Sequence, residues 1–202
     1  ANPPYSLKKW GVDHAKSEMK VGNRFRSDNT GVPFKSYKRF KYGIPPDSSG
    51  DYAFVQHIIA SMSDTGKACV VLPHGVLFRG NEEGEIRRKI IEDDLLEAVI
   101  GLPENLFYNT PIPTCVLVLN KRKRRNRKNK VLFINSEFCF TKGQGVNVLS
   151  RKNVGKIVGT LANFETHQRF SSVACVEDIK KAKYNLNIRR WADASPPPEN
   201  FD

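Results

Sequence analysis

The chain has no apolar run long enough to cross a membrane, and it is poor in residues that bind metals. None of its apolar runs reaches the roughly 18 residues that a spanning helix requires. Its four cysteines are far apart with no CxxC pair, and its four histidines fall at no ligand spacing, so no zinc site is predicted. No secretory signal is recognisable. We therefore expect a protein without metal, neither inserted in a membrane nor secreted, in a reducing cytoplasm.

A glycine-rich turn that could cradle a nucleotide cofactor is also lacking. The segment Gly143-Gln-Gly145 is a lone GxG that follows a late strand and a loop, so we reject it as a cofactor cradle. An acidic cluster typical of a nuclease is likewise missing, and restriction activity is not expected. With 202 residues, the chain is long enough for one domain with a sizeable core, or for one domain plus an appendage.

Positive charge is abundant, because 33 Lys and Arg face 21 Asp and Glu for a net charge of +12. This excess favours a polyanionic partner such as nucleic acid. Eight of the ten residues from 121 to 130 are basic. They fit a solvated hairpin turn or a contact with phosphates, and a basic turn beside a nucleic-acid cleft would serve both. Residues 34 to 42 alternate aromatic and basic side chains. We favour stacking and phosphate contact on a nucleic acid for them, although they also suit anchoring of a loop to the core.

Apolar spacing predicts alternating helices and strands from residue 51 onward. Helices are expected at about 51–62, 82–93, 150–164 and 176–183, and strands at 67–73, 96–102, 114–120 and, as an edge strand, 131–135. Cys69 and Cys115 lie in apolar runs and are expected in the core. Residues 6–50 are predicted to form a long loop. The alternation predicts an α/β sheet with helices on both faces.

The predicted third helix has a recognisable start and an apolar stripe. Ser150 is expected to cap it. The stripe is expected to comprise Val154, Ile157, Val158, Leu161 and Phe164.

The residues Asn2-Pro3-Pro4-Tyr5 form the most informative motif of the chain. Two prolines fix two φ angles near −65° and remove two backbone donors, which makes the segment stiff and extended. The asparagine amide offers an acceptor and two donors, and the tyrosine offers a flat face. These groups suit an exocyclic amino group on a flat ring, whose hydrogens the Asn2 oxygen and a proline-flanked carbonyl accept. The alternative is a surface turn.

This motif resembles motif IV of S-adenosylmethionine-dependent methyltransferases that act on amino groups. In addition, five stretches agree in order and spacing with the modification subunit of type I restriction-modification systems, an adenine-N6 DNA methyltransferase. They are NPPYSLKKWG, KYGIPPDSSGDYAFVQHII, VVLPHGVLFRG, DDLLEAVIGLPENLFYNTPIPTCVLVLNK and YNLNIRRW. The resemblance runs from Asn2 to about Trp191.

The resemblance implies an α/β fold that is the second half of a Rossmann-like S-adenosylmethionine-dependent methyltransferase sheet with a C-terminal helical extension. Residues 1–135 would be the C-terminal part of the catalytic domain, 136–194 the helical extension and 195–202 a disordered tail.

The resemblance also implies roles for the motif. Asn2 and the Pro3 carbonyl would accept hydrogen bonds from the amino group of the target adenine, within a catalytic motif that Pro4 and Tyr5 complete. Tyr5 would stack on the adenine once it is flipped out of the duplex.

Two further aromatic residues resemble family positions. Phe107 resembles a second aromatic that covers the other face of the base, and Phe54 resembles an aromatic near the cofactor adenine. By spacing alone, Phe54 fits a core position, whereas Phe107 lies in a loop, where it fits a ligand contact about as well as a packing role. His74 follows a strand at a place where α/β sites gather. Because amino methylation needs no strong base, we interpret it as a polar loop residue.

The family holds S-adenosylmethionine with a glycine-rich turn upstream of the motif, and only Ala1 precedes Asn2 here. We therefore expect the C-terminal portion of a longer subunit, with an exposed sheet edge and no activity alone. The implied partners are double-stranded DNA and the specificity and restriction subunits of the same system. Docking of the specificity subunit is expected between Ser150 and Trp191.

Two other functions stay open at this point. The same motif serves methylation of RNA bases and of protein glutamines. A non-catalytic DNA-binding module, with the basic turn as its contact surface, is the third reading.

Overall fold

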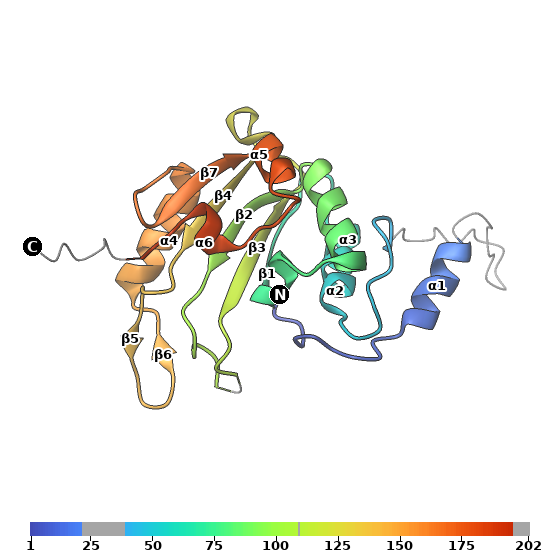
Figure 1. Ribbon diagram of the computed structural model, residues 1–202, viewed down its shortest axis with the longest axis horizontal. Coiled ribbons are helices and arrows are strands. Elements are labelled where there is room, and N and C mark those ends of the chain that lie inside the picture. Colours follow the sequence, from blue (N-terminus) through green and yellow to red (C-terminus); the bar gives the residue numbers. More distant parts are fainter. Residues whose placement is uncertain (22–38, 109, 196–202) are drawn as a thin grey trace, which may run out of the picture.

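The chain folds into a five-stranded mixed sheet with helices on both faces (Figure 1). The computed structural model describes residues 1–21, 39–108 and 110–195. The helices are α1 (Val12–Val21), α2 (Asp51–Ser61), α3 (Asn81–Glu92), α4 (Arg151–Asn163), α5 (Val176–Lys181) and α6 (Ile188–Trp191). The strands are β1 (Lys67–Pro73), β2 (Leu96–Gly101), β3 (Thr114–Asn120), β4 (Lys130–Asn135), β5 (Thr141–Lys142), β6 (Asn147–Val148) and β7 (Ser171–Cys175). In these described ranges, no helix is long and apolar enough to span a membrane.

The strand order of the main sheet is β1-β3-β2-β4-β7. Strands β1 and β2 flank β3 and both run antiparallel to it, so they are parallel to each other. Strand β4 pairs parallel with β2, and β7 closes the sheet antiparallel to β4. Strands β1, β2 and β4 therefore end at the same edge of the sheet, which we call the carboxyl edge. It lies at the bottom of Figure 1.

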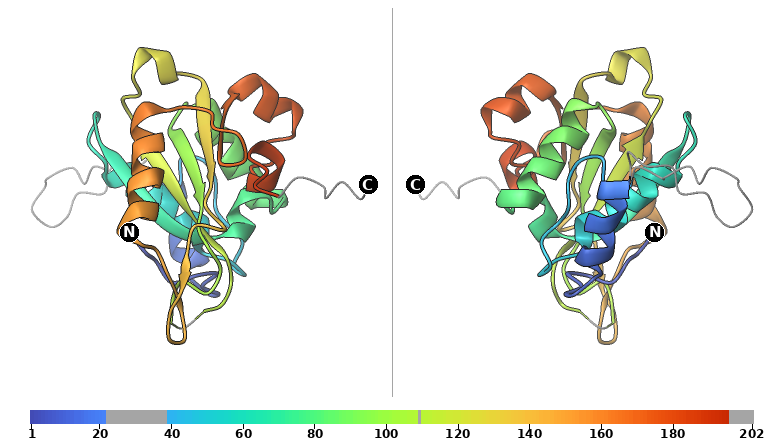
Figure 2. Two further views of the ribbon diagram at one scale, coloured as in Figure 1. Left: turned by 90° about the vertical axis from the view of Figure 1, so that its left-hand side faces the viewer. Right: turned by 90° about the vertical axis from the view of Figure 1, so that its right-hand side faces the viewer.

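Two apolar clusters lie on opposite faces of the sheet, because successive side chains of a strand alternate between its faces. One cluster joins residues such as Val99, Leu117 and Phe133 to helices α2, α3, α5 and α6. The other joins Leu132 and neighbouring strand residues to Ile157 of α4. Figure 2 shows α4 on one side of the sheet, with α3, α5 and α6 on the other side. The predicted two-faced α/β architecture is confirmed.

Most predicted elements are confirmed within a residue or two. This holds for α2, α3 and α5 and for strands β1, β2 and β3, whose sequences are strongly periodic or continuously apolar. The predicted cap of α4 is also present, since the Ser150 hydroxyl accepts a hydrogen bond of 3.2 Å from the Asn153 backbone N–H.

Three predictions from the sequence are wrong, and a fourth is only partly right. Strand β4 is not an edge strand, because β7 pairs with its outer side. The expected loop at 6–50 contains helix α1. Cys69 is exposed, because it points to the opposite face of β1 from the buried Val70 and Leu72, whereas Cys115 is buried as predicted. The stripe of α4 is predicted in part, since Ile157, Leu161 and Phe164 pack on the cluster whereas Val154 and Val158 are 43% and 56% exposed.

The segment 136–194, which we expected to be helical, also contributes strands. Strands β5 and β6 form a short antiparallel hairpin. Strand β7 belongs to the main sheet, and Trp191 of α6 stacks on Phe133 of β4 with ring centroids 5.2 Å apart. The segment therefore packs directly on the sheet of the preceding residues.

Candidate active site at the carboxyl edge of the sheet

The Asn-Pro-Pro-Tyr motif begins beside β1. The Ala1 amino group donates to the Cys69 carbonyl at 2.7 Å, and the Val71 N–H donates to the Ala1 carbonyl at 2.9 Å. These two bonds are the pattern of one residue paired parallel to β1. The motif therefore continues in the direction of β1 and leaves the sheet at the carboxyl edge, where ligands bind in open α/β sheets.

Within the motif, the tyrosine orients the asparagine. The Tyr5 hydroxyl donates to Asn2 Oδ1 at 2.9 Å. An amide oxygen has two lone pairs, so this bond fixes the orientation of the amide and leaves one acceptor site on Oδ1. Asn2 is exposed, whereas Tyr5 is half-buried. Burial raises the pKa of the Tyr5 hydroxyl, and the Cys115 thiol acts in the same direction, so the hydroxyl remains a donor at neutral pH.

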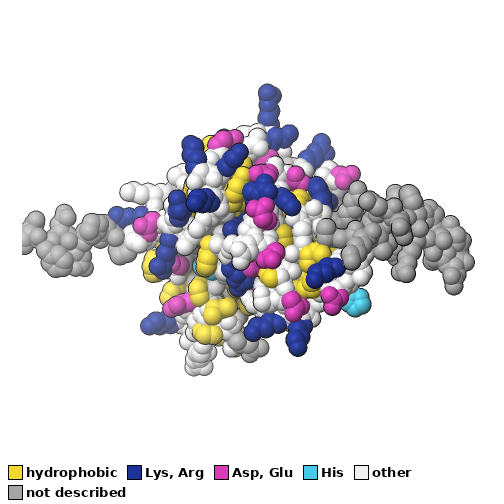
Figure 3. Space-filling model, turned by 45° about the vertical axis from the view of Figure 1, so that its right-hand side comes forward, with side chains coloured by type: hydrophobic (Ala, Val, Ile, Leu, Met, Phe, Trp, Pro, Cys, Tyr) yellow, Lys and Arg dark blue, Asp and Glu magenta, His cyan; other side chains and the backbone are white. Residues whose placement is uncertain are grey.

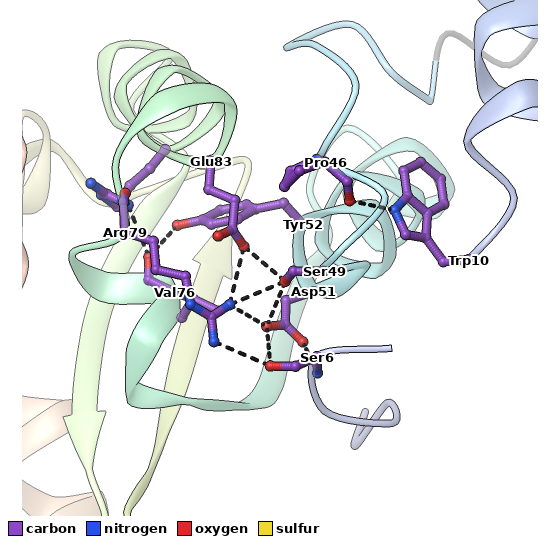
Figure 4. Close-up of polar contacts among 10 residues, drawn as sticks. Ser6, Trp10, Pro46, Ser49, Asp51, Tyr52, Val76, Arg79 and Glu83 are labelled. Atoms are coloured by element: carbon purple, nitrogen blue, oxygen red, sulfur yellow. Dashed lines mark hydrogen bonds and ion pairs between the residues drawn. The ribbon is translucent and has the colours of Figure 1, made fainter. Parts of the chain in front are cut away.

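A buried polar cluster holds Ser6, the residue that follows the motif (Figure 4). The Ser6 N–H donates to Asp51 Oδ1 at 2.7 Å, and Arg79 Nη2 donates to Ser6 Oγ at 3.1 Å. Arg79 Nη1 also donates to Asp51 Oδ2 at 3.0 Å and to Ser49 Oγ at 3.1 Å. Ser6 has a positive φ of 48°, a strained conformation for serine that these bonds stabilise. The cluster thereby fixes the exit of the motif against the start of α2.

The same cluster contains a second buried carboxyl group. Glu83 of α3 accepts from Ser49 Oγ at 3.0 Å and from Arg79 Nη1 at 3.4 Å. Burial raises the pKa of Glu83, and Arg79 and Ser49 oppose this effect. One guanidinium thus lies between two carboxyl groups. Sequence reasoning missed this cluster, because only the Arg79–Glu83 spacing of four residues hinted at it.

Trp10 provides the next anchor after the motif. Its Nε1 donates to the Pro46 carbonyl at 2.9 Å, and its ring contacts Phe40 with centroids 5.7 Å apart. A Cβ at Gly50 would lie 2.9 Å from the Trp10 side chain, so only glycine allows this approach. Residues 6–10 are therefore held against the loop that leads into α2.

The aromatic residues at the end of the stretch 34–42 are core residues. Phe40 and Tyr42 are buried, and the Tyr42 hydroxyl donates to Asp93 Oδ2 at 2.9 Å. For these two, anchoring of the loop is the correct interpretation and our preference for nucleic-acid stacking is wrong. Phe34, Lys35, Tyr37 and Lys38 lie outside the described residues.

Phe107 lies in the loop between β2 and β3, which starts at the carboxyl edge. It is half-buried against the apolar cluster on the α4 side, and its carbonyl accepts from the Thr110 N–H at 3.2 Å. The neighbouring Tyr108 is 88% exposed. The fold therefore brings Phe107 to the same edge of the sheet as the motif.

Phe54 lies on α2 and lines a hollow of about 360 Å³. Its aromatic and imidazole walls are formed by Trp10, His14, Phe40 and His57. Such walls suit a flat ring such as the adenine of the cofactor. Among the described residues that line the hollow there is no Asp or Glu that could bind ribose hydroxyls, so the fit is to the ring alone.

His74 follows β1 at the carboxyl edge, but its contacts are structural. Its Nε2 lies 2.9 Å from the Thr114 carbonyl, to which the neutral imidazole donates. Burial lowers the pKa of His74, which disfavours the imidazolium. These contacts fit a polar loop residue. In the described ranges, no group of three or more His, Cys, Asp or Glu side chains is placed to hold a metal ion.

The basic turn between β3 and β4 lies at the opposite edge of the sheet from the motif, at the top of Figure 1. Two of its cations are buried in ion pairs, Lys123 with Asp94 at 2.6 Å and Arg127 with Glu97 at 3.1 Å. Arg127 also donates to the Ala162 carbonyl at the end of α4. The turn thus contributes to the fold and is not adjacent to the candidate site.

Comparisons with known proteins identify the family of the chain. Residues 1–200 match the family N-6 DNA Methylase. The type I restriction enzyme MjaVII methylase subunit of Methanocaldococcus jannaschii is 39% identical over 205 residues, covering 100% of this chain and 33% of that protein. The MpnII methylase subunit of Mycoplasma pneumoniae is 31% identical over 202 residues, covering 100% of this chain and 34% of that protein.

A solved structure extends the likeness to three dimensions. The crystal structure of a type I restriction-modification system methyltransferase subunit from Streptococcus thermophilus has a TM-score of 0.79 and 36% identity, over 95% of this chain and 37% of that one. The predicted methyltransferase fold is thereby confirmed. The chain spans about a third of the length of the curated relatives it matches. It belongs to the N-6 DNA methylase family.

Proposed function

We propose that the protein containing these residues is the modification subunit of a type I restriction-modification system and methylates adenine N6 in double-stranded DNA. One observation carries the proposal: the Asn-Pro-Pro-Tyr motif leaves the sheet at the carboxyl edge with its amide oriented by Tyr5. Relatives that are type I methylase subunits support it.

In this proposal the motif holds the amino group of the target base. Asn2 Oδ1 accepts one of its hydrogens through the lone pair that Tyr5 leaves free, and the Pro3 carbonyl accepts the other. Both bonds raise the electron density on the nitrogen and direct its lone pair away from the motif. The surplus proton leaves to water, so no residue has to act as a strong base, which agrees with a neutral His74.

Aromatic rings cover the two faces of the base. A base inside a duplex cannot reach this site, so it must be flipped out, at a cost of a few kcal/mol in lost stacking and pairing. Stacking on an aromatic ring contributes about 1–3 kcal/mol per base and offsets part of this cost. We assign this stacking to Tyr5 on one face and Phe107 on the other.

The family implies S-adenosylmethionine as the cofactor. When bound, it supplies an electrophilic methyl group on a positively charged sulfur. We assign Phe54 and its hollow to the cofactor adenine, because the walls are aromatic. The ribose and the methionine part would need groups that the residues lining this hollow do not provide.

We propose double-stranded DNA and the specificity and restriction subunits of the same system as partners. The segment from Ser150 to Trp191 is the proposed docking region for the specificity subunit, and a cytoplasmic location follows from this role. Strand β7 ties this segment to the main sheet, so a subunit docked there would lie on the catalytic fold itself.

The test is methylation in cells. The full-length gene product would be co-expressed with its specificity subunit in a host without adenine methylation, and genomic DNA would be read for N6-methyladenine. We expect methylation at one defined site and its loss in Asn2→Ala. A soluble, assembled complex that leaves adenine unmodified would refute the proposal and favour another amino-group substrate or a binding-only role.

A further inference from the structure

The β5–β6 hairpin is hydrogen-bonded to the loop that carries Phe107. The Asn147 N–H donates to the Asn105 carbonyl at 2.7 Å, and Asn147 Nδ2 donates to the Glu104 carbonyl at 2.9 Å. In the reverse direction, Asn105 Nδ2 donates to the Gly145 carbonyl at 3.2 Å. Two asparagine side chains, 42 positions apart in the sequence, thus join two loops that both extend beyond the carboxyl edge (Figure 1).

The backbone conformation of both loops permits these contacts. Asn105 has a φ of 50° and Gly145 a φ of 89°, both in the left-handed region that asparagine and glycine adopt at the lowest cost. A Cβ at Gly143 would lie 2.6 Å from the Val146 carbonyl oxygen, so the hairpin closes only with glycine there. These residues present the Gly145 carbonyl and the Asn147 amide toward the β2–β3 loop.

Two other kinds of contact hold the described part of the β2–β3 loop, internal hydrogen bonds and the packing of Leu106 and Phe107. Its internal bonds in the described residues are Asn105 N–H to the Pro111 carbonyl at 3.1 Å, Thr110 N–H to the Phe107 carbonyl at 3.2 Å and Ile112 N–H to Thr110 Oγ1 at 3.4 Å. Tyr108 and Ile112 are exposed, whereas Leu106 and Phe107 pack against the apolar cluster on the α4 side. The hairpin thus adds three hydrogen bonds that place the backbone just before Phe107, while the α4-side cluster supports one side of its ring.

We propose that Asn105 and Asn147 are positioning residues that hold Phe107 over the flipped adenine, an inference that rests on the proposed function. The two amides join the β2–β3 loop to the hairpin, and the hairpin continues directly into α4 on the sheet. Phe107 is thereby fixed relative to a rigid element. Precise placement is valuable in this site, because a shift of about 1 Å in a reacting group can cost roughly 100-fold in rate.

The first test is Asn147→Asp in the full-length protein with its specificity subunit. Aspartate keeps the shape of the side chain but has no N–H to donate to Glu104. We expect kcat to fall roughly 10- to 100-fold, by loss of placement, with unchanged affinity for S-adenosylmethionine. The matched control is Gln144→Glu, which adds the same charge to the same hairpin. No hydrogen bond of the Gln144 side chain is found among the described residues, so this control is expected to behave like the wild type.

The second test asks whether Asn147 acts through Phe107. DNA with 2-aminopurine at the target position reports stacking, because an aromatic ring on the flipped base quenches its emission. We expect Asn147→Asp and Phe107→Ala each to lengthen the emission lifetime. The double variant should be no slower in methyl transfer than Phe107→Ala alone.

Each outcome has a separate meaning. Additive losses in the double variant, or wild-type kinetics in Asn147→Asp, would overturn the positioning role while leaving the methyltransferase proposal intact. Wild-type behaviour of Phe107→Ala would overturn the role of Phe107 itself, and with it the positioning role. If Asn147→Asp does not assemble, Asn105→Asp breaks the bond to Gly145 from the other side and decides the question in the same assays.

Discussion

The hydrogen bond from Tyr5 to Asn2 gives the tyrosine two separate functions in the proposed site. Its ring is a stacking surface for the base, and its hydroxyl keeps the asparagine oxygen turned so that one lone pair is available. A phenylalanine would provide the first function without the second. The two functions can therefore be separated by one substitution.

Tyr5→Phe should retain base stacking and lose the orientation of the Asn2 amide. A hydrogen bond of this kind contributes about 0.5–1.5 kcal/mol net, which corresponds to roughly a two- to tenfold fall in kcat. The KM for DNA should hardly change, because the ring remains. Steady-state methylation of a site-containing duplex measures both constants. A Tyr5→Phe enzyme with the wild-type kcat would show that Asn2 needs no orienting donor.

The Arg79 cluster predicts a pH effect on stability. Burial raises the pKa of Glu83 above its ordinary 4.5, so the folded state holds this proton more tightly than the unfolded state does. The contribution to stability is full below pH 4.5 and is lost as the pH rises through the raised value. Glu83→Gln removes this pH-dependent loss of stability, because glutamine does not ionise, and its amide oxygen can still accept the hydrogen bond from Ser49. We expect the melting temperature of the variant, relative to that of the wild type, to rise as the pH is raised from about 4 to 7.

Glu85→Gln on the same helix is the control, because the pKa of Glu85 is shifted in the opposite direction. Hydrogen bonding to Arg88 lowers the pKa of this exposed carboxyl group, so its small contribution is present at neutral pH and is lost on acidification. The melting temperature of this variant, relative to that of the wild type, should therefore fall slightly as the pH is raised toward 7. If the melting temperatures of both variants changed with pH in the same direction relative to the wild type, burial of Glu83 could not be the cause of the effect.

At the level of elements, the sequence predicted those segments whose own residues determine their structure. The run KACVVLP became β1 and TCVLVLN became β3, because short apolar runs that contain valines and are bounded by Gly or Pro favour a strand. Ser150 predicted the start of α4, because an N-cap depends only on local bonds. Strand β7 was missed, because two serines hide its alternation and its pairing with β4 decides its conformation.

The candidate site was predictable to the same limited extent. The motif could be recognised because its four residues are contiguous, whereas the groups that hold it come from distant parts of the chain. Ser6 and Arg79 are 73 residues apart, and Ser6 and Asp51 are 45 apart. Similarly, nothing in the spacing of Asn105 and Asn147 indicates that they meet. Such contacts are set by the order of strands in the sheet, which single-sequence periodicity does not determine.

At the scale of the whole molecule, the Lys and Arg side chains of the described residues are spread over several elements. On the face shown in Figure 3, Lys and Arg side chains are interspersed with Asp and Glu. The densest basic segment, residues 121–130, lies at the opposite edge of the sheet from the motif. By contrast, Lys8 and Lys9 are exposed and lie three and four residues after Tyr5. A duplex held with its base at the motif therefore meets these lysines before it meets the basic turn.

The salt dependence of DNA binding can separate these two regions. Each phosphate contact contributes about 0.9 to the slope of log K against log salt concentration. Replacing Lys8 and Lys9 by glutamine should reduce the slope by up to about 2, if each contacts one phosphate. Replacing the exposed Arg124 and Arg125 removes the same charge and should leave the slope near the wild-type value. Fluorescence anisotropy of the assembled complex on its target duplex, over a series of salt concentrations, measures both slopes. The reverse result would place the duplex over the basic turn and argue for the binding-only alternative, because a flipped base could not then reach Asn2.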